Sequence, residues 1–311
     1  MKKISETIVF FGNERLATGV QTAAPTLQAL VEAGYNIAAV VSNYETGQSR
    51  NARLLEIREV AEKHGIPVLL PTKLTEITQQ LRSYNASAGV LVAYGKIVPQ
   101  AVIDIFPRGI INIHPSLLPL HRGPTPIESI ILSGETQTGV SIMKLAKEMD
   151  AGPVYAAREV TSKGTESKQE LSEKLLAIGK DLLINSLPDI IDGTLRAQPQ
   201  DDSKATYDTL LSKADGLMDL SKSAVQLERE VRAYAEWPKS LTELAGKEII
   251  ITKAHAVHYP ELIAQAKTFI TPDGLIGMLA GEGVLVIDRL KPAGKNEMSA
   301  KEFIAGYGRL L

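Results

Sequence analysis

Short apolar runs alternate with segments of helical spacing along the first 190 residues, and this alternation constrains the fold more than any other feature. The runs are rich in Val, Ile and Leu and occupy residues 7–11, 37–41, 67–70 and 88–93. Helical spacing fills the intervals at residues 26–33, 53–63 and 73–83. Strands that alternate with helices in this way form βαβ units around buried parallel strands. We therefore predict an α/β domain with a mostly parallel sheet and helices on both faces.

The expected arrangement is Rossmann-like, but the usual nucleotide-binding motifs are missing. The first run ends in Gly12-Asn13-Glu14-Arg15, which is not the start of a G-x-G-x-x-G sequence. No G-x-x-x-x-G-K-[ST] sequence occurs anywhere in the chain. We therefore predict a Rossmann-like sheet that binds no nicotinamide dinucleotide.

Asn112 and His114 form the sharpest polar pair, in an apolar run that ends at Pro115. If residues 110–114 form a strand, the two side chains point to the same side, at a strand end where open α/β sheets bind ligands. An amide can donate to a developing oxyanion, and an imidazole can move a proton near neutral pH. The alternative is that Asn112 and His114 have a structural role and only cap a turn. Asp150, in a second tight turn after a strand, is a candidate carboxylate to orient the imidazole.

The sequence gives little support for thiol chemistry, for a metal site or for membrane contact. The chain has no cysteine, which excludes disulfides, thiol catalysis and thiolate metal sites. His255 and His258 are the other close histidine pair, but i and i+3 face opposite ways in a strand, so we predict no metal site. No apolar run approaches the roughly 20 residues of a membrane helix, and we expect a cytoplasmic protein without membrane contact. The net charge of −2 means that any nucleic-acid contact must come from local basic clusters.

The composition changes near residue 191. A polar stretch with Gly and Pro but without apolar periodicity follows, and we predict an interdomain linker at residues 191–206. Short strands separated by turn residues recur from Lys247 onward, which favours a small β-barrel. We therefore predict a first domain at residues 1–190 and a second at residues 207–311.

These residues resemble the folate-dependent formyltransferase family over nearly the whole chain. The segment Asn112–Gly123 matches one hallmark of the family, and Thr138–Met143 followed by Asp150-Ala-Gly152 matches a second. The resemblance implies formyl transfer from 10-formyltetrahydrofolate as cosubstrate, with no metal. It also implies a catalytic trio of Asn112, His114 and Asp150.

The resemblance implies a donor site as well. The family's folate-contacting loop corresponds to Ser116, Leu117, Leu118 and Pro119, and the segment on the pterin side to Val92, Ala93 and Tyr94. The chain departs from the family after the first strand, where Gly12-Asn13-Glu14-Arg15-Leu16-Ala17 replaces a Gly-Thr-Pro sequence and an aromatic residue. Because of this departure, the resemblance does not imply the shape of the pocket that would hold the methionyl end of the acceptor.

The acceptor is implied by the second domain. Residues 224–234 with Trp237-Pro238, and residues 290–300, resemble the C-terminal domain of the methionyl-tRNA branch of the family, a small open OB-like barrel that binds initiator tRNA. The resemblance thus implies initiator methionyl-tRNA as the partner, and we expect a monomer. Candidate tRNA contacts are the basic residues Arg50, Arg53, Lys291 and Lys295.

Three alternatives remain at this stage. A nucleotide-amino-sugar formyltransferase shares both hallmarks and can carry a similar second domain. Glycinamide ribonucleotide formyltransferase shares the catalytic hallmark but needs no second domain of this size. A non-catalytic RNA-binding protein that kept the fold would not need an intact trio.

Overall fold

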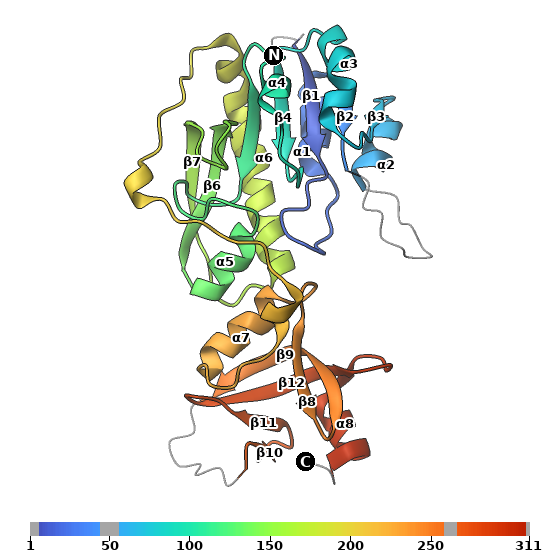
Figure 1. Cartoon of the computed structure of the whole chain (residues 1–311), viewed down its shortest axis with the longest axis vertical. Helices are drawn as coiled ribbons and strands as arrows, with labels where there is room; N and C mark the ends of the chain where they lie inside the picture. Colours follow the sequence, from blue (N-terminus) through green and yellow to red (C-terminus); the bar gives the residue numbers. More distant parts are fainter. Residues whose placement is uncertain (1–5, 44–55, 258–265, 309–311) are drawn as a thin grey trace. The chain divides into compact units, whose positions relative to one another are not determined.

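The computed structural model describes residues 6–43, 56–257 and 266–308, and packing divides the chain into two units (Figure 1). The first unit comprises Met1–Ile127, Thr136–Lys163 and Gln169–Thr209, and the second comprises Glu128–Glu135, Gly164–Lys168 and Leu210–Leu311. The predicted linker, residues 191–206, lies within the first unit. There Gln198 pairs with Val154 through two backbone hydrogen bonds of 2.8 Å.

A seven-stranded sheet forms the centre of the first unit, in the order β3-β2-β1-β4-β5-β6-β7. Neighbouring strands from β3 to β5 pair in parallel, whereas β6 pairs antiparallel with both β5 and β7. The strands are β1 (Thr7–Gly12), β2 (Asn36–Val41), β3 (Val68–Leu69), β4 (Ala88–Val92), β5 (Ile110–His114), β6 (Gln137–Lys144) and β7 (Val154–Thr161). The predicted mostly parallel sheet is confirmed.

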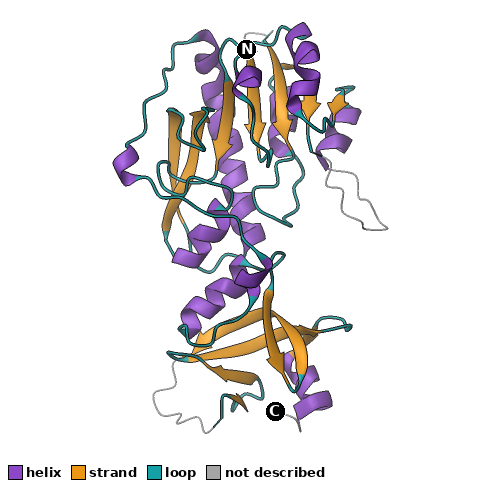
Figure 2. Ribbon diagram, viewed as in Figure 1, coloured by secondary structure: helices purple, strands orange, loops and turns teal. Residues whose placement is uncertain are grey.

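Helices cover both faces of this sheet, and a helix follows each strand from β1 to β5 along the chain (Figure 2). On one face, Val9, Phe11 and Ile110 pack with side chains of α3 and α4. On the other face α6 lies so close that a Cβ added to Gly179 would meet Ile113 Cγ2 at 2.6 Å. The helices of this unit are α1 (Pro25–Glu32), α2 (Glu56–Lys63), α3 (Thr78–Ser83), α4 (Gln100–Ile103) and α6 (Lys168–Asp192), and most of α5 (Pro126–Ser133) belongs to the second unit.

The strand order reverses between β1 and β4. The chain passes from β1 outward to β2 and β3 on one side, and then to β4 and β5 on the other. Crevices that bind ligands form at such reversals, beside the carboxyl ends of the parallel strands. The carboxyl ends of β1, β4 and β5 are therefore where a site is expected, and β5 ends at His114.

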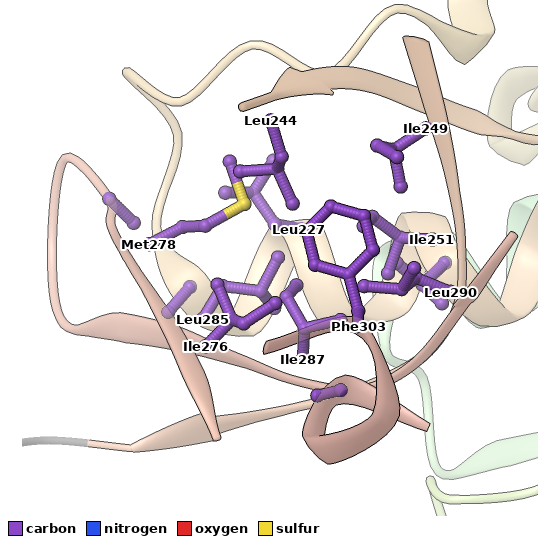
Figure 3. Close-up of a cluster of buried hydrophobic side chains, with 14 residues drawn as sticks. Leu227, Leu244, Ile249, Ile251, Ile276, Met278, Leu285, Ile287, Leu290 and Phe303 are labelled. Carbon is purple, nitrogen blue, oxygen red and sulfur yellow. The ribbon is translucent and has the colours of Figure 1, made fainter. Parts of the chain in front are cut away.

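The second unit contains a curled antiparallel sheet in the order β10-β11-β12-β9-β8, with β13 paired to β12. The strands are β8 (Ser240–Leu244), β9 (Lys247–Val257), β10 (Thr268–Ile270), β11 (Ile276–Leu279), β12 (Val284–Pro292) and β13 (Met298–Ser299). Helices α7 (Ala224–Ala233) and α8 (Ala300–Tyr307) complete the unit. Figure 3 shows Leu227 of α7 and Phe303 of α8 packed against side chains of the strands.

Local details differ from the predictions. The helix expected at residues 73–83 begins as a 3-10 turn, Leu74–Ile77, before α3. Helix α6 continues through Pro188 to Asp192. Strand β8 was not predicted, because its sequence Ser-Leu-Thr-Glu-Leu is short and half polar. No helix in the described parts of the chain has the length and apolar character that a membrane crossing requires.

Candidate active site

Asn112 and His114 lie on β5 and point to the same side of the sheet, as predicted from their spacing. Asn112 lies opposite Met143 of β6, and His114 lies opposite Ser141. Both side chains are nearly enclosed, with 6% of Asn112 and 4% of His114 exposed. No hydrogen bond within the described residues engages the Asn112 side-chain amide, so its N–H donors remain available to a ligand.

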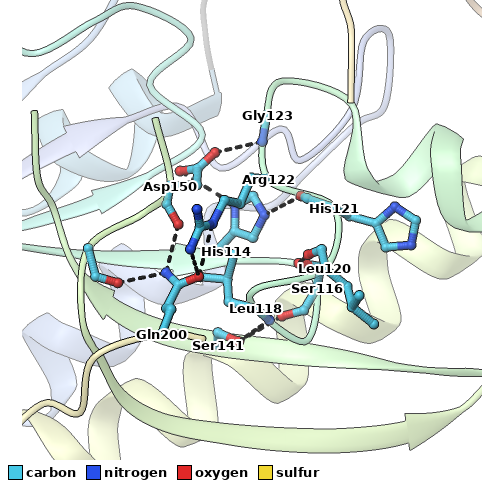
Figure 4. A network of polar contacts seen from close by, with 11 residues as sticks. His114, Ser116, Leu118, Leu120, His121, Arg122, Gly123, Ser141, Asp150 and Gln200 are labelled. Carbon is cyan, nitrogen blue, oxygen red and sulfur yellow. Dashed lines mark hydrogen bonds and ion pairs between the residues drawn. The ribbon is translucent and has the colours of Figure 1, made fainter. Parts of the chain in front are cut away.

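The two ring nitrogens of His114 have different environments (Figure 4). Nε2 lies 2.8 Å from the carbonyl oxygen of His121, which can only accept a hydrogen bond, so Nε2 carries a proton. Nδ1 lies 3.8 Å from Asp150 Oδ1, too far for a direct hydrogen bond. Nδ1 is therefore the ring nitrogen left free for a reacting atom, and that atom could lie within hydrogen-bond reach of both Nδ1 and the carboxylate.

Asp150 is held in an uncommon conformation. Its φ of 50° lies in the left-handed region, and its Oδ2 accepts a 2.9 Å hydrogen bond from the backbone N–H of Gly123. Gly152 closes the same turn, where an added Cβ would lie 1.8 Å from the carbonyl oxygen of Lys144. The turn therefore has little freedom, and its shape directs the Asp150 carboxylate towards His114.

The loop that follows β5 is fixed by two serine hydroxyls. Ser116 Oγ donates to the Leu120 carbonyl at 2.6 Å. Ser141 Oγ donates to the Ser116 carbonyl at 2.8 Å and accepts from the Leu118 N–H at 3.0 Å. The peptide bond between Leu118 and Pro119 is cis. The predicted donor loop, Ser116 to Pro119, thus has a defined path directly beside His114.

The second predicted donor segment, Val92 to Tyr94, follows β4. The carbonyls of Val92 and Ala93 accept hydrogen bonds from Glu14 and Asn13, and Asn43 Nδ2 donates to the Tyr94 carbonyl. Within the described residues, Ser42 Oγ and Asn43 Oδ1 are buried without a hydrogen-bond partner. Buried polar atoms are rarely left unpaired, so these two oxygens are candidate acceptors for the N–H groups of a ligand.

Gly12 to Arg15, where the chain departs from the family, forms a compact turn. Glu14 is 1% exposed, and its two oxygens accept 2.8 Å hydrogen bonds from the N–H groups of Thr26 and Leu27 at the start of α1. Burial raises the pKa of the Glu14 carboxyl to about 7, against the lowering effect of those N–H groups. Arg15 extends away from Glu14 and pairs with Glu56 of α2 at 2.7 Å.

Several residues of the site were not predicted. Ser141, Arg122 and Gln200 hold the loops around His114 and Asp150, and Asn43 lies beside Tyr94. Ser141 and Arg122 lie inside the quoted motifs, so the motifs contained a signal for them. Gln200 lies in the predicted linker, where no local pattern distinguishes it.

Of the predicted tRNA contacts, the structure describes two and leaves two undescribed. Arg50 and Arg53 lie outside the described residues. Lys291 and Lys295 lie in the second unit, at the end of β12 and in the turn that follows it, and both are exposed. Lys291 contributes to the positive field that, after hydrogen bonds from Thr252 and Arg289, lowers the pKa of Glu297.

Comparison with known proteins covers both units. Residues 8–187 match the formyl transferase family, and residues 210–308 match the formyl transferase C-terminal domain. The chain is 37% identical to the methionyl-tRNA formyltransferase of Chloroflexus aggregans, over 96% of each protein. Both the N-terminal and the C-terminal units are therefore included in the match.

Solved structures share the fold at lower identity. HypX from Aquifex aeolicus gives a TM-score of 0.68 at 15% identity, covering 98% of this chain and 49% of HypX, so the chain spans about half of that protein. An N-formyltransferase from Helicobacter canadensis, solved with folinic acid and dTDP-3-aminofucose, gives 0.66 at 16% identity, covering 91% and 98%. These two likenesses support the architecture alone. The sequence matches across both units carry the assignment, and the chain belongs to the methionyl-tRNA formyltransferase family.

Proposed function

We propose that this chain transfers the formyl group of 10-formyltetrahydrofolate to the α-amino group of methionine on initiator methionyl-tRNA, giving N-formylmethionyl-tRNA for translation initiation. The observation that carries the proposal is the 37% identity to a methionyl-tRNA formyltransferase over 96% of the chain, which includes the C-terminal domain. The environment of Asn112, His114 and Asp150 gives this reaction a physical basis.

The residues beside His114 fit a folate donor. Bound there, the donor supplies an electrophilic formyl carbon on N10. Ser116 to Pro119 would form one wall of its site, and Val92 to Tyr94 the other. The unpaired, buried Ser42 Oγ and Asn43 Oδ1 suit a ligand rich in N–H groups, as a pterin is.

Asn112 and His114 would stabilise the charge that develops on the formyl oxygen. The Asn112 amide is enclosed and has no competing partner among the described residues, so it can donate to that oxygen without first breaking another bond. His114 Nδ1 would be the second donor in the protonated ring, because Nε2 is occupied by the His121 carbonyl. Donors fixed in advance in an enclosed site are typically worth roughly 3–4 kcal/mol each to the transition state.

Asp150 would hold His114 and help the proton travel from the attacking amine to the departing N10. Its Oδ2 is occupied by the Gly123 N–H, which leaves Oδ1 on the side of His114 Nδ1. Because Nδ1 already carries a proton in this mechanism, the attacking amine would give its proton to Oδ1, and Asp150 would pass it to N10 as the bond between the formyl carbon and N10 breaks. The trio would thus combine charge stabilisation with a short proton path.

The second unit would bind the tRNA through phosphate contacts that include Lys291 and Lys295. Its curled antiparallel sheet and exposed lysines fit such a role. All members of the proposed trio come from one chain, so we propose that a monomer is sufficient. A role in translation initiation further implies a cytoplasmic protein.

An acceptor competition tests the proposal. Purified protein is given 10-formyltetrahydrofolate with charged initiator tRNA, glycinamide ribonucleotide or an amino-sugar nucleotide, and formylated product is measured. Formylation of the tRNA alone is expected. Formylation of the amino sugar, whose transferases share the fold, would overturn the proposed acceptor, and transfer to none of the three would overturn the proposed activity.

A further inference from the structure

Gln200 joins the two segments that hold the catalytic side chains, although it lies outside every sequence motif (Figure 4). Its Nε2 donates to the backbone oxygens of Asp150 and Gly152, each at 2.7 Å. Its Oε1 accepts from Nε and Nη2 of Arg122, at 3.0 and 2.8 Å. One side-chain amide therefore links the Asp150 turn to the Arg122 loop.

The Asp150 turn is a place where such support matters. Asp adopts the left-handed region more readily than most non-glycine residues, and the contacts around it select that conformation over the alternatives. Gln200 donates to the carbonyls on both sides of Ala151, so it fixes the backbone orientation at Asp150. Gln200 thus holds the Asp150 backbone, and the Gly123 N–H holds its carboxylate, in the arrangement that lies 3.8 Å from His114.

Arg122 carries the other half of the link. Its side chain is 1% exposed and donates to the Tyr207 hydroxyl at 2.8 Å as well as to Gln200. The residues on either side of it touch the catalytic pair directly: the His121 carbonyl accepts from His114, and the Gly123 N–H donates to Asp150. A shift of Arg122 would therefore move the anchors of both His114 and Asp150.

We propose that Gln200 is a positioning residue for the formyl transfer, acting through Asp150 and, by way of Arg122, through His114. The inference rests on the proposed function, because it assigns a role within that site. It predicts that loss of the Gln200 donors lowers turnover while leaving substrate binding nearly unchanged. A purely structural Gln200 would instead affect stability, or affect turnover independently of Asp150.

Gln200→Glu is the sharpest variant. The carboxylate can still accept from Arg122, but it places an acceptor where the Asp150 and Gly152 carbonyls need a donor. We expect kcat to fall about 10–100-fold, as for displacements near 1 Å in an active site, with KM for donor and tRNA within about twofold. Gln200→Met, which removes both links without adding charge, should lower kcat at least as far and serves if the glutamate variant folds poorly.

The matched control is Gln198→Glu. Gln198 lies two residues away on the same segment, pairs with Val154 through its backbone, and has an exposed side chain. It makes the same charge change and should keep kcat within twofold of the wild type. If both Gln200 variants also keep wild-type kcat, the inference is wrong.

A double-mutant cycle with Asp150→Asn tests the route of action. Because part of the effect of Gln200 passes through Asp150, adding Gln200→Glu to Asp150→Asn should lower kcat by a smaller factor than the same substitution does in the wild type, since coupled residues are not additive. Full multiplication of the two losses would overturn the inference. A purely structural role would give that multiplication.

A second readout does not depend on the acceptor. The imidazole nitrogen resonances of His114, assigned with a His114→Gln variant, should move in Gln200→Glu and stay fixed in Gln198→Glu. If they stay fixed in both variants, the positioning role fails even when no substrate is identified. If they move while the wild type formylates none of the offered acceptors, the proposed function fails and the positioning role stands.

Discussion

Two regions of the molecule, the site around His114 and the core of the second unit, maintain their shape by different means. Around His114, geometry depends on directional hydrogen bonds among polar groups, including the buried Arg122 and Ser141 and the half-buried Gln200. Among the described residues of the second unit, fourteen buried apolar residues, which include Leu227, Ile251 and Phe303, form one core cluster (Figure 3). Burial of apolar surface is non-directional, whereas a hydrogen bond requires its partner at one distance and angle. The hydrogen bonds around His114 fix the positions of catalytic atoms, and the apolar core of the second unit supplies stability.

This contrast predicts that the same size of change has different consequences in the two places. Removing a polar group near His114 should lower turnover with little loss of stability, while removing an apolar group from the second core should do the reverse. Variants that move both quantities together would break the comparison.

The largest effect is expected for Phe303→Ala. Phe303 is fully buried, and its ring lies 4.8 Å from that of Tyr307. Truncation should lower the free energy of unfolding of the second unit by about 3–5 kcal/mol, through lost transfer energy and the cavity left behind. Urea unfolding followed by fluorescence of Trp237, the single tryptophan, reports on this unit.

Val225→Ala is the matched control for that measurement. Val225 lies on α7 in the same unit but is 51% exposed, so its truncation should change the unfolding free energy by less than about 0.5 kcal/mol. Equal losses for Phe303→Ala and Val225→Ala would mean that the cluster around Phe303 is not what holds the unit together.

Asn112→Ala should have the next largest effect, on turnover and not on stability. Loss of one oxyanion donor should reduce kcat by about two to three orders of magnitude, equivalent to roughly 3–4 kcal/mol. Urea unfolding followed by far-ultraviolet circular dichroism, which reports on the secondary structure of both units, should coincide with that of the wild type. Near-wild-type turnover in this variant would remove Asn112 from the proposed mechanism.

Much of the first unit follows from local sequence. The strand at residues 110–114 was predicted from its apolar run and from Pro115, and period-two alternation placed Asn112 and His114 on one face, as the register confirms. Asp150 was a candidate because it lies in a tight turn after a strand. The turn brings it within 3.8 Å of His114.

The supporting residues could not be predicted in the same way. Gln200 contacts residues 48 to 78 positions away, and hydrogen bonds between loops leave no periodic pattern in sequence. The segment that contains it therefore has the composition of a linker while packing as part of the first unit. Glu14 was noticed as a departure from the family, but its contact with the start of α1 depends on the fold.

Glu14→Gln should change how stability depends on pH. Because the native pKa of about 7 is above the ordinary 4.5, the folded chain binds the Glu14 proton more tightly than the unfolded chain does. This contribution is fully present below pH 4.5 and is lost as pH rises through 7, with an upper limit of roughly 3 kcal/mol. Glutamine cannot ionise, so relative to Glu14→Gln the wild type should lose stability between pH 4.5 and 7.5.

Urea unfolding across that pH range checks the prediction, and Glu32→Gln is its control. Glu32 is an exposed carboxyl on α1, so the substitution makes the same charge change on the helix that Glu14 caps. A pH profile for Glu14→Gln parallel to that of the wild type would contradict a buried carboxyl with a raised pKa.

Substitution of Lys291 and Lys295 should have the smallest effect on stability and turnover, because both side chains are exposed and do not fix the positions of catalytic atoms. Exposed lysines bind phosphate by long-range attraction, so their loss should weaken tRNA binding without changing which tRNA is preferred. In the Lys291→Ala, Lys295→Ala double variant, the slope of log affinity against log salt should become shallower by about 2, about 1 for each lost contact.

The corresponding pair of arginine substitutions keeps both charges and should keep the wild-type slope. An unchanged slope in the alanine pair would remove these lysines from the tRNA interface. A loss of turnover at saturating tRNA would instead mean that these surface lysines affect the positions of the catalytic atoms. That result would contradict the comparison, which gives this role to the hydrogen bonds around His114.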